Sequence, residues 1–407
     1  MSKIKKISSA ILFSYLLFPF YFKGVETITQ AFIYGASTII VLCSLPYLLN
    51  RLRINDLKNN IIAFIMLCLL ILDAIILIAS LHFTNDYSYC SSFLGDLRNF
   101  LRVTAGIIFI QKIILRKDID DKKYISLCTN AICIYVIASF VLLVPSIRIK
   151  WLNFISISDT NADMTNAVAY YTRFGLQGFS GFMHTCICNI GILLLLCKSV
   201  IRTEDIIKII LLMIGCICYG RIGLIGATSL IVIYFITKGR CSKILIAITV
   251  TSIILLLGFY IFYDQLRSEP WFYWAFEPII KYYENGSFES SSSNELKDMW
   301  FLPSPECLLF GEGRYTNIDR TYYMHTDVGV LRRVLFGGSI FTGLLYIANI
   351  CPLIALWKYN KHNKLLIYGS ILLIILFESK GEAIGYFATI FFPFYFTKKI
   401  RSKGGTI

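Results

Sequence analysis

Long, uninterrupted apolar runs limit what this sequence can fold into more than any other feature. One of them, ILIAITVTSIILLLGFYIFY, covers residues 244–263 without a single charge. About 20 apolar residues in helical form cross a hydrocarbon core about 30 Å thick. The whole chain is 57% hydrophobic and 16% charged, with a mean hydropathy of +0.67, whereas soluble domains average about 45–50% apolar and about 25% charged residues. The sequence therefore predicts a membrane protein that crosses the bilayer many times.

The apolar runs favour helices, because a membrane barrel would show alternating segments of about ten residues. Their positions predict an all-α, polytopic fold with about 12 transmembrane helices in a single transmembrane domain over residues 1–407. We expect the spans at 8–22, 28–50, 61–81, 99–115, 124–145, 181–197, 206–219, 221–237, 244–263, 334–357, 365–377 and 383–397.

The basic residues predict which side of the membrane each connection occupies. Most of the 39 lysines and arginines fall in the N-terminal segment, in every second connection and in the tail from residue 398. The positive-inside rule places these segments in the cytoplasm, so we expect both termini there. The net charge of +14 is then explained by topology, and no nucleic-acid partner is required. The start, MSKIKKISSAILFSYLL, lacks a small-residue cleavage site and is interpreted as a retained first span.

Two external connections are long, at residues 146–180 and 264–333. Loops of this length are usually functional or disordered. In the second loop we expect short interfacial helices in its aromatic first part, and a flexible polar surface in the tract NGSFESSSSNELKD (285–298).

The basic residues left on the external side are mostly arginines, whose planar fork matches phosphate and carboxylate groups. The stretch LLFGEGRYTNIDRTYYMHTDVGVLRRVLF (308–336) places Arg314, Arg320 and Arg332 just before and at the start of a span. A helix N-terminus already favours anions, so this segment is a candidate phosphate site. His325 and Asp327 add a titratable pair. The alternative is that these arginines extend toward lipid headgroups.

Two further segments combine glycines with a cation near a predicted external surface. The stretch YYTRFGLQGFSGFMHTCICNIG (170–191) contains Arg173 and, one turn into a span, His184; the latter could equally be a core histidine. In CYGRIGLIGA (218–227), Arg221 occupies a tight external turn, where topology does not require an arginine. The neighbouring glycines allow helices to approach closely.

Ionisable residues inside predicted spans or at their external edge form a third set of candidates. Arg98 and Arg102 in GDLRNFLRVTAG (95–106) are four residues apart and share a helix face. The alternative role for this pair is a salt bridge to an external acid such as Asp96. Asp73 lies mid-span and is the best single indication of a proton-coupled transporter.

The sequence predicts neither a metal site nor a cofactor. It lacks a nucleotide-binding loop, an HExxH motif and an external acidic pair of the kind that holds a metal for sugar-nucleotide chemistry. The 13 cysteines lie mostly in apolar runs, where thiols behave as small hydrophobes. Cys90 and Cys307, in predicted external loops, could form a disulfide or remain as thiols.

Three of these segments resemble the O-antigen polymerase (Wzy-type) family of bacterial inner-membrane proteins and, more distantly, the O-antigen ligases. They are RFGLQGFSGFMH (173–184), GRIGLIGA (220–227) and FGEGRY with HTDVGVLRR (310–333). The ligases often show a His-Asn pair where this chain has HTDVG and HTC, which favours the polymerase. The resemblance implies a multi-pass protein of the bacterial inner membrane whose two long loops are periplasmic.

The same resemblance implies a metal-independent, GT-C-like glycosyltransferase that takes part in lipopolysaccharide biosynthesis. Its substrates would be oligosaccharides linked to undecaprenyl pyrophosphate in the membrane lipid. The resemblance leaves open whether a protein that regulates chain length is a further partner. We expect Asp327 or His325 to activate the acceptor hydroxyl and Arg221 and Arg314 to act in catalysis. Substrate contacts are expected from Arg173, Arg320, Arg332, Arg98, Arg102 and His184. The alternatives are an O-antigen ligase and a flippase of lipid-linked oligosaccharides.

Overall fold

The computed structural model describes residues 3–48, 74–75, 77–78, 88–156, 173, 175–178, 181–238, 260–261, 263–286, 291–317, 321–360 and 363–397. All regular structure in these ranges is helical. The described residues add two isolated β-bridges, Phe22 with Ile155 and Thr316 with Tyr322. The all-α prediction is therefore confirmed.

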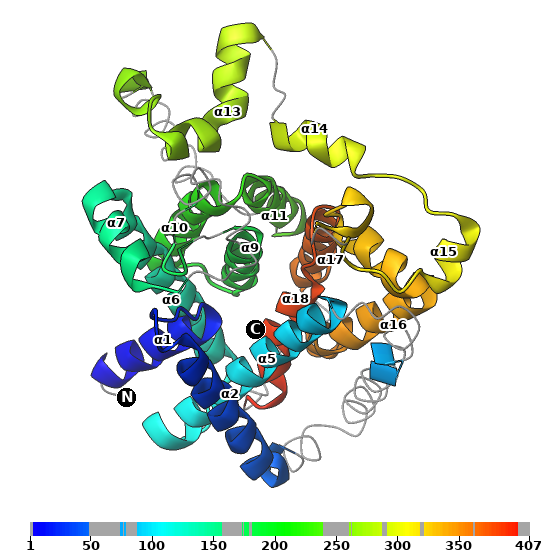
Figure 1. Cartoon of the computed structure of the whole chain (residues 1–407). Coiled ribbons are helices and arrows are strands. Elements are labelled where there is room, and N and C mark those ends of the chain that lie inside the picture. The colour runs from blue at the N-terminus through cyan, green and yellow to red at the C-terminus, as the bar shows by residue number, and fades with distance from the viewer. Residues whose placement is uncertain are drawn as a thin grey trace.

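Figure 1 labels the helices in chain order. Their bounds are α1 Lys3–Leu17, α2 Glu26–Cys43, α5 Ser88–Phe109, α6 Asp121–Phe140, α7 Pro145–Phe154, α9 Phe182–Leu196, α10 Thr203–Tyr219, α11 Ile222–Lys238, α13 Pro270–Asn285, α14 Ser291–Asp298, α15 Pro305–Phe310, α16 Gly329–Tyr359, α17 Lys364–Glu378 and α18 Ile384–Phe391. Short turns extend or separate them: η1 Ile110–Ile114, η2 Val141–Leu143, η4 Tyr323–His325 and η5 Phe392–Tyr395. The stretches between α2 and α5, between α7 and α9 and between α11 and α13 lie largely outside the described residues.

Three helices are long and apolar enough to cross a membrane by themselves, at Glu26–Cys43, Asp121–Leu143 and Gly329–Trp357. Shorter apolar helices cover Phe182–Leu196, Ile222–Lys238 and Ile384–Tyr395. These elements support a membrane-embedded helical protein. The predicted span 61–81, which includes Asp73, and the predicted span 244–263 lie largely outside the described residues.

The predicted start of the fourth span is wrong. We expected it at residue 99, because Asp96 and Arg98 were assigned to the external side, but α5 begins at Ser88. The helix continues through these charges because Asp96 faces α18, where Gly385 leaves room for it. The polar tract of the second long loop is also partly helical, since α14 covers Ser291–Asp298. The aromatic segment before it forms α13, as predicted.

Helix α9 lies in the middle of the bundle, and every residue from His184 to Leu196 is buried. It packs against α6, α10, α11 and α17. Glycines on α11 make this packing close: a Cβ at Gly223 would lie 2.2 Å from the Thr185 side chain, and one at Gly226 would lie 2.7 Å from Asn189. Such small residues let helices approach closely in the absence of a hydrophobic drive between them.

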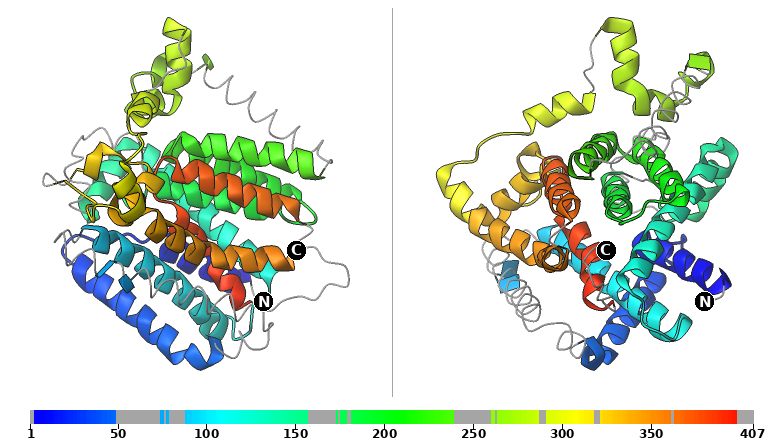
Figure 2. Two further views of the ribbon diagram at one scale, coloured as in Figure 1. Left: turned by 90° about the vertical axis from the view of Figure 1, so that its right-hand side faces the viewer. Right: turned by 180° about the vertical axis from the view of Figure 1, so that it is seen from behind.

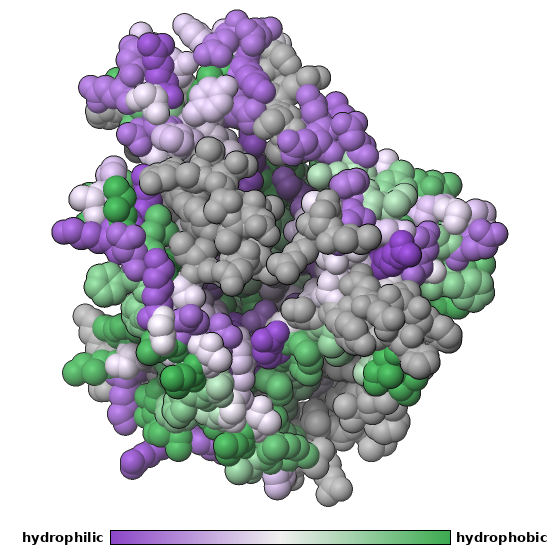
Figure 3. Space-filling model, in the orientation of Figure 1, coloured by the Kyte–Doolittle hydropathy of each residue, from purple (hydrophilic) through white to green (hydrophobic). Residues whose placement is uncertain are grey.

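The direction of the helices gathers several connections at one end of the bundle. The phenol of Tyr124, near the start of α6, donates to the Ile390 carbonyl at 2.7 Å, and Thr397 donates to the Asp121 carboxylate. The chain therefore leaves α18 beside the start of α6, and α18 begins at the opposite end. We call that opposite end the loop end; it contains residues 173–178, 219–221, 326–329 and 379–383. Helices α13, α14 and α15 lie at the periphery of the bundle (Figure 2). Hydrophilic side chains gather over α13 and α14 (Figure 3).

Candidate functional site

Backbone contacts between glycines hold the loop end together. A Cβ at Gly329, the first residue of α16, would lie 2.3 Å from the Gly381 carbonyl oxygen, and one at Gly381 would lie 3.1 Å from the Phe182 ring. Gly220 likewise touches Thr185, with 2.8 Å from its Cβ position to the hydroxyl. The starts of α9, α11, α16 and α18 therefore meet at one place, although they are far apart in the sequence.

Arg332 lies in the first turn of α16 between two tyrosines. Its guanidinium carbon is 4.0 Å from the ring centroid of Tyr315 and 4.0 Å from that of Tyr322. One nitrogen is 3.8 Å from the Glu382 carboxylate. The side chain is 8% exposed, and within the described residues its Nε has no hydrogen-bond partner. A buried donor without a partner costs free energy, so this N–H is available to a ligand.

Arg333 is neutralised by two glutamates. Its Nη1 lies 2.9 Å from Glu378 and its Nε lies 3.7 Å from Glu382. Tyr346 also donates to Glu378. Arg333 is 2% exposed, so it does not extend toward lipid headgroups, and its charge belongs to this buried pair. Breaking such a pair on one side costs about 3–5 kcal/mol.

Glu378 joins three segments through one carboxylate. One oxygen accepts from Arg333, and the other accepts the backbone N–H groups of Ala383 and Ile384, each at 2.7 Å. These N–H groups belong to the start of α18, which otherwise has no intrahelical acceptor for them. The sequence interpretation missed Glu378 and Glu382. Two acids four residues apart around a glycine, FESKGEAIG (377–385), between two spans were the signal that could have found them.

A second group of cations meets on α13. The guanidinium carbons of Arg173 and Arg221 lie 4.6 and 5.2 Å from the Trp274 ring centroid. Arg221 also forms an ion pair with Glu277 at 2.6 Å, and Lys281 contacts the same carboxylate at 2.8 Å. The tryptophan thus lies against two arginines from separate segments, as in cation–π contacts.

Asp327 links the two groups electrostatically. Burial and the neighbouring Glu382 carboxylate raise its pKa to about 6, against the opposing effect of the cations Arg332, Lys380 and Arg173. Burial also lowers the pKa of Lys380, and repulsion from Arg173 and Arg221 lowers it further. Burial, and then Arg221, lower the pKa of Arg173 to about 10. Positive charge is therefore in local excess around Asp327, and an added anion would relieve it. We call Arg173, Arg221, Asp327, Arg332 and Lys380 the loop-end cluster.

The other predicted site residues lie elsewhere or are exposed. Arg314 and His325 are exposed, and His325 has a left-handed backbone with a φ of 53°. Arg98 donates to the Leu94 carbonyl of its own helix at 3.0 Å. Arg320 lies outside the described residues.

Arg102 and His184 make internal contacts in the helical core. Arg102 donates to the Leu16 carbonyl at 2.7 Å and to Asn99 at 2.7 Å, and it is 3% exposed. His184 shares a hydrogen bond of 2.9 Å with the Tyr135 hydroxyl and stacks on Phe18. These contacts favour structural roles for both side chains, and within the described residues the alternative salt bridge of Arg98 or Arg102 to Asp96 is not formed.

Neither a metal ligand set nor a disulfide emerges from the described part of the chain. Among those residues no group of three or more His, Cys, Asp or Glu side chains is arranged to hold a metal ion. Cys90 and Cys307 are both free thiols.

Comparison of the sequence with protein-family models and with curated proteins gave no match, and comparison of the fold with solved structures gave none either. The geometry of the loop end therefore carries the proposed function.

Proposed function

We propose that this chain is a metal-independent glycosyltransferase of the O-antigen polymerase type, acting at the periplasmic face of the bacterial inner membrane. Its substrates are oligosaccharide repeat units linked to undecaprenyl pyrophosphate. The observation that carries the proposal is the excess of positive charge around Asp327, where Arg173, Lys380 and Arg332 approach one partly buried carboxyl group. The resemblance of the same segments to this family suggests the reaction that the cluster would catalyse.

The reaction needs what this cluster supplies. The acceptor hydroxyl oxygen forms a bond to the anomeric carbon of the donor sugar, while the bond from that carbon to the diphosphate oxygen breaks. The electron pair leaves with undecaprenyl pyrophosphate, which gains negative charge. Fixed cations aimed at developing charge commonly supply the largest catalytic contribution, and here Arg332 offers an unused Nε–H and Lys380 an ammonium group of lowered pKa.

Asp327 is suited to receive the proton of the acceptor hydroxyl. A general base works best when its pKa lies near the operating pH, and burial raises the pKa of this carboxyl group to about 6. It is therefore ionised at neutral pH and still basic enough to take a proton. His325, exposed on η4, is the second candidate for this step.

A reconstituted reaction tests the proposal. The purified protein is placed in lipid nanodiscs with undecaprenyl-pyrophosphate-linked repeat units from the strain that supplies the gene, without nucleotide sugar. A polymerase produces a ladder of products lengthened by whole repeats. An O-antigen ligase transfers glycan only when lipid A-core is supplied, and a flippase does not lengthen the glycan. Transfer that requires lipid A-core, or products that are not lengthened, would therefore refute the proposal.

The matched variants are Arg221→Lys and Arg267→Lys. Arg221 lies in the loop-end cluster, whereas Arg267 is 62% exposed and pairs only weakly with Asp264 at 4.0 Å. Lysine keeps the charge but loses the fork. We expect Arg221→Lys to shorten the ladder strongly and Arg267→Lys to leave it unchanged; equal ladders from both variants would contradict the assignment of the site.

A further inference from the structure

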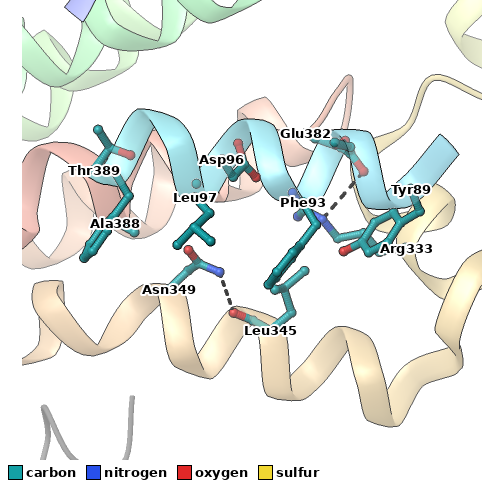
Figure 4. A pocket seen from close by; sticks show the side chains of 13 residues that line it. Tyr89, Phe93, Asp96, Leu97, Arg333, Leu345, Asn349, Glu382, Ala388 and Thr389 are labelled. Carbon is teal, nitrogen blue, oxygen red and sulfur yellow. Dashed lines mark hydrogen bonds and ion pairs between the residues drawn. The ribbon is translucent and has the colours of Figure 1, made fainter. Parts of the chain in front are cut away.

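A cleft between α5, α16 and α18 lies next to the loop-end cluster but has a different character (Figure 4). About 60 Å³ of it is available to the centres of water-sized molecules. One water molecule needs about 10–15 Å³ of this measure, so the cleft holds about four to six waters. A space of this size suits one sugar ring better than a longer oligosaccharide.

The carboxyl group of Asp96 lines this cleft. Within the described residues, no hydrogen bond or ion pair joins it to another residue. It lies against Gly385, where a Cβ would be 2.7 Å from the nearer carboxylate oxygen. The nearest strong cation, Arg333, is already bound to Glu378 and Glu382. The Asp96 oxygens are therefore available to hydrogen-bond donors on a ligand.

The remaining walls combine apolar faces with a few polar groups. Phe93 and Tyr89 present aromatic rings, and Asn349 and Thr389 add an amide and a hydroxyl (Figure 4). The amide N–H of Asn349 donates to the Leu345 carbonyl at 2.9 Å, which leaves its oxygen as an acceptor. Aromatic surface beside a few convergent acceptors is the chemistry that recognises a sugar, since its ring has apolar C–H faces and a rim of hydroxyl donors.

Charge separates this cleft from the loop-end cluster. In the cleft, Glu382 pairs with Arg333 and Asp96 adds a further carboxyl group, whereas the cluster gathers Arg332, Lys380 and Arg173 around the single carboxyl group of Asp327. A diphosphate would be repelled from the cleft, and an isoprenoid tail alone would desolvate a carboxyl group without compensating it. The Arg332–Glu382 pair stands between the two regions, at a distance of 3.8 Å between its charged groups.

We propose that this cleft binds the terminal sugar ring of the acceptor, with Asp96 accepting hydrogen bonds from its hydroxyl groups. The assignment of the bound sugar to the acceptor rests on the proposed function. The acceptor's own diphosphate lies a full repeat away from its terminal sugar, so this neutral ring can enter an acidic cleft while the donor diphosphate occupies the loop-end cluster.

Two measurements test the inference. The first is saturation-transfer NMR on the full-length protein in nanodiscs, with the soluble repeat-unit oligosaccharide released from its carrier by mild acid as the probe. The second is the KM for lipid-linked acceptor in the ladder assay. The variants are Asp96→Asn, which keeps the shape of the side chain, and Thr389→Val, which serves if the first variant fails to fold. Leu94→Ala is the control, because Leu94 lies on the exposed face of α5.

Asparagine replaces one of the two carboxyl oxygens with an NH2 group, which cannot accept a hydrogen bond from a sugar hydroxyl, so we expect Asp96→Asn to weaken oligosaccharide binding and raise the acceptor KM by about tenfold. The value of kcat should change much less, and Leu94→Ala should match the wild type. Wild-type binding by both folded cleft variants would overturn the inference while the ladder itself still supports the polymerase. Binding that depends on Asp96 without any ladder would instead retain the sugar cleft and refute the polymerase.

Discussion

Replacing Asp327 with asparagine should stabilise the fold while it removes activity. Burial raises the pKa of this carboxyl group from 3.8 to about 6. One pKa unit corresponds to about 1.36 kcal/mol, so at pH 8 the ionised carboxylate costs the folded state at most about 3 kcal/mol. Asparagine resembles the protonated acid in shape and carries no charge. The variant should therefore unfold at a higher temperature than the wild type at pH 8.

The sign of the effect depends on pH in a defined way. A raised pKa means that the folded state binds the proton more tightly, so the stabilisation by protonation is fully present below about pH 4 and is lost as the pH rises through about 6. The difference in Tm between Asp327→Asn and the wild type should therefore be small near pH 4 and grow as the pH rises through about 6.

The assay is thermal unfolding in nanodiscs, followed by tryptophan fluorescence at pH 8 and pH 4.5, alongside the initial rate of ladder formation. Loss of a general base typically lowers the rate by about 10²–10⁴-fold. Asp298→Asn is the control, because Asp298 is exposed on α14; it should change neither quantity. A lower Tm for Asp327→Asn at pH 8 would refute the reasoning, since it would mean that contacts with the surrounding cations outweigh the cost of burial.

Three further predictions follow from the same region. Wild-type ladder formation should fall as the pH drops through about 6, where Asp327 takes up a proton; a rate unchanged down to pH 5 would point to another base. Glu378→Gln should destabilise the fold by up to about 3–5 kcal/mol, because it removes the nearer of the two carboxylates that neutralise the buried Arg333 and leaves Glu382 at 3.7 Å; denaturation followed by tryptophan fluorescence would show it, and an unchanged midpoint would contradict it. Gly329→Ala should lower both Tm and activity, because its Cβ would lie 2.3 Å from the Gly381 carbonyl oxygen, whereas Gly343→Ala, with open space around its Cβ position, should be tolerated.

Much of the fold could be predicted from hydropathy alone. The expected spans 181–197, 206–219, 221–237 and 365–377 agree with α9, α10, α11 and α17 to within a few residues, since each is a continuous apolar run bounded by charges or glycines. The start of α5 could not be predicted in this way. Its charged first half is helical because a distant glycine, Gly385, accommodates Asp96, and that contact is invisible in the local sequence.

The candidate site was predicted in part. Arg173 and Arg332 both act on the Asp327 carboxyl group, whereas Arg221 pairs with Glu277 and lies beside Arg173 on the Trp274 ring. Arginine charge alone, however, does not reveal which guanidinium group is already neutralised. Arg333 differs from Arg332 by one helical position, and only the packing shows that Glu378 takes its charge. The sequence also gave Lys380 no special weight, because a lone lysine between two spans is ordinary.

The position of the Trp274 ring makes it an intrinsic optical probe of anion binding. It lies within 5.2 Å of the guanidinium carbons of both Arg173 and Arg221, so its indole reports directly on the occupancy of that corner. An anion that binds beside the two arginines alters the electric field around the indole. An optical titration of unlabelled protein with inorganic pyrophosphate, with a Trp274→Phe sample as the blank, therefore measures anion binding beside Arg173 and Arg221 before any carrier-linked glycan is prepared.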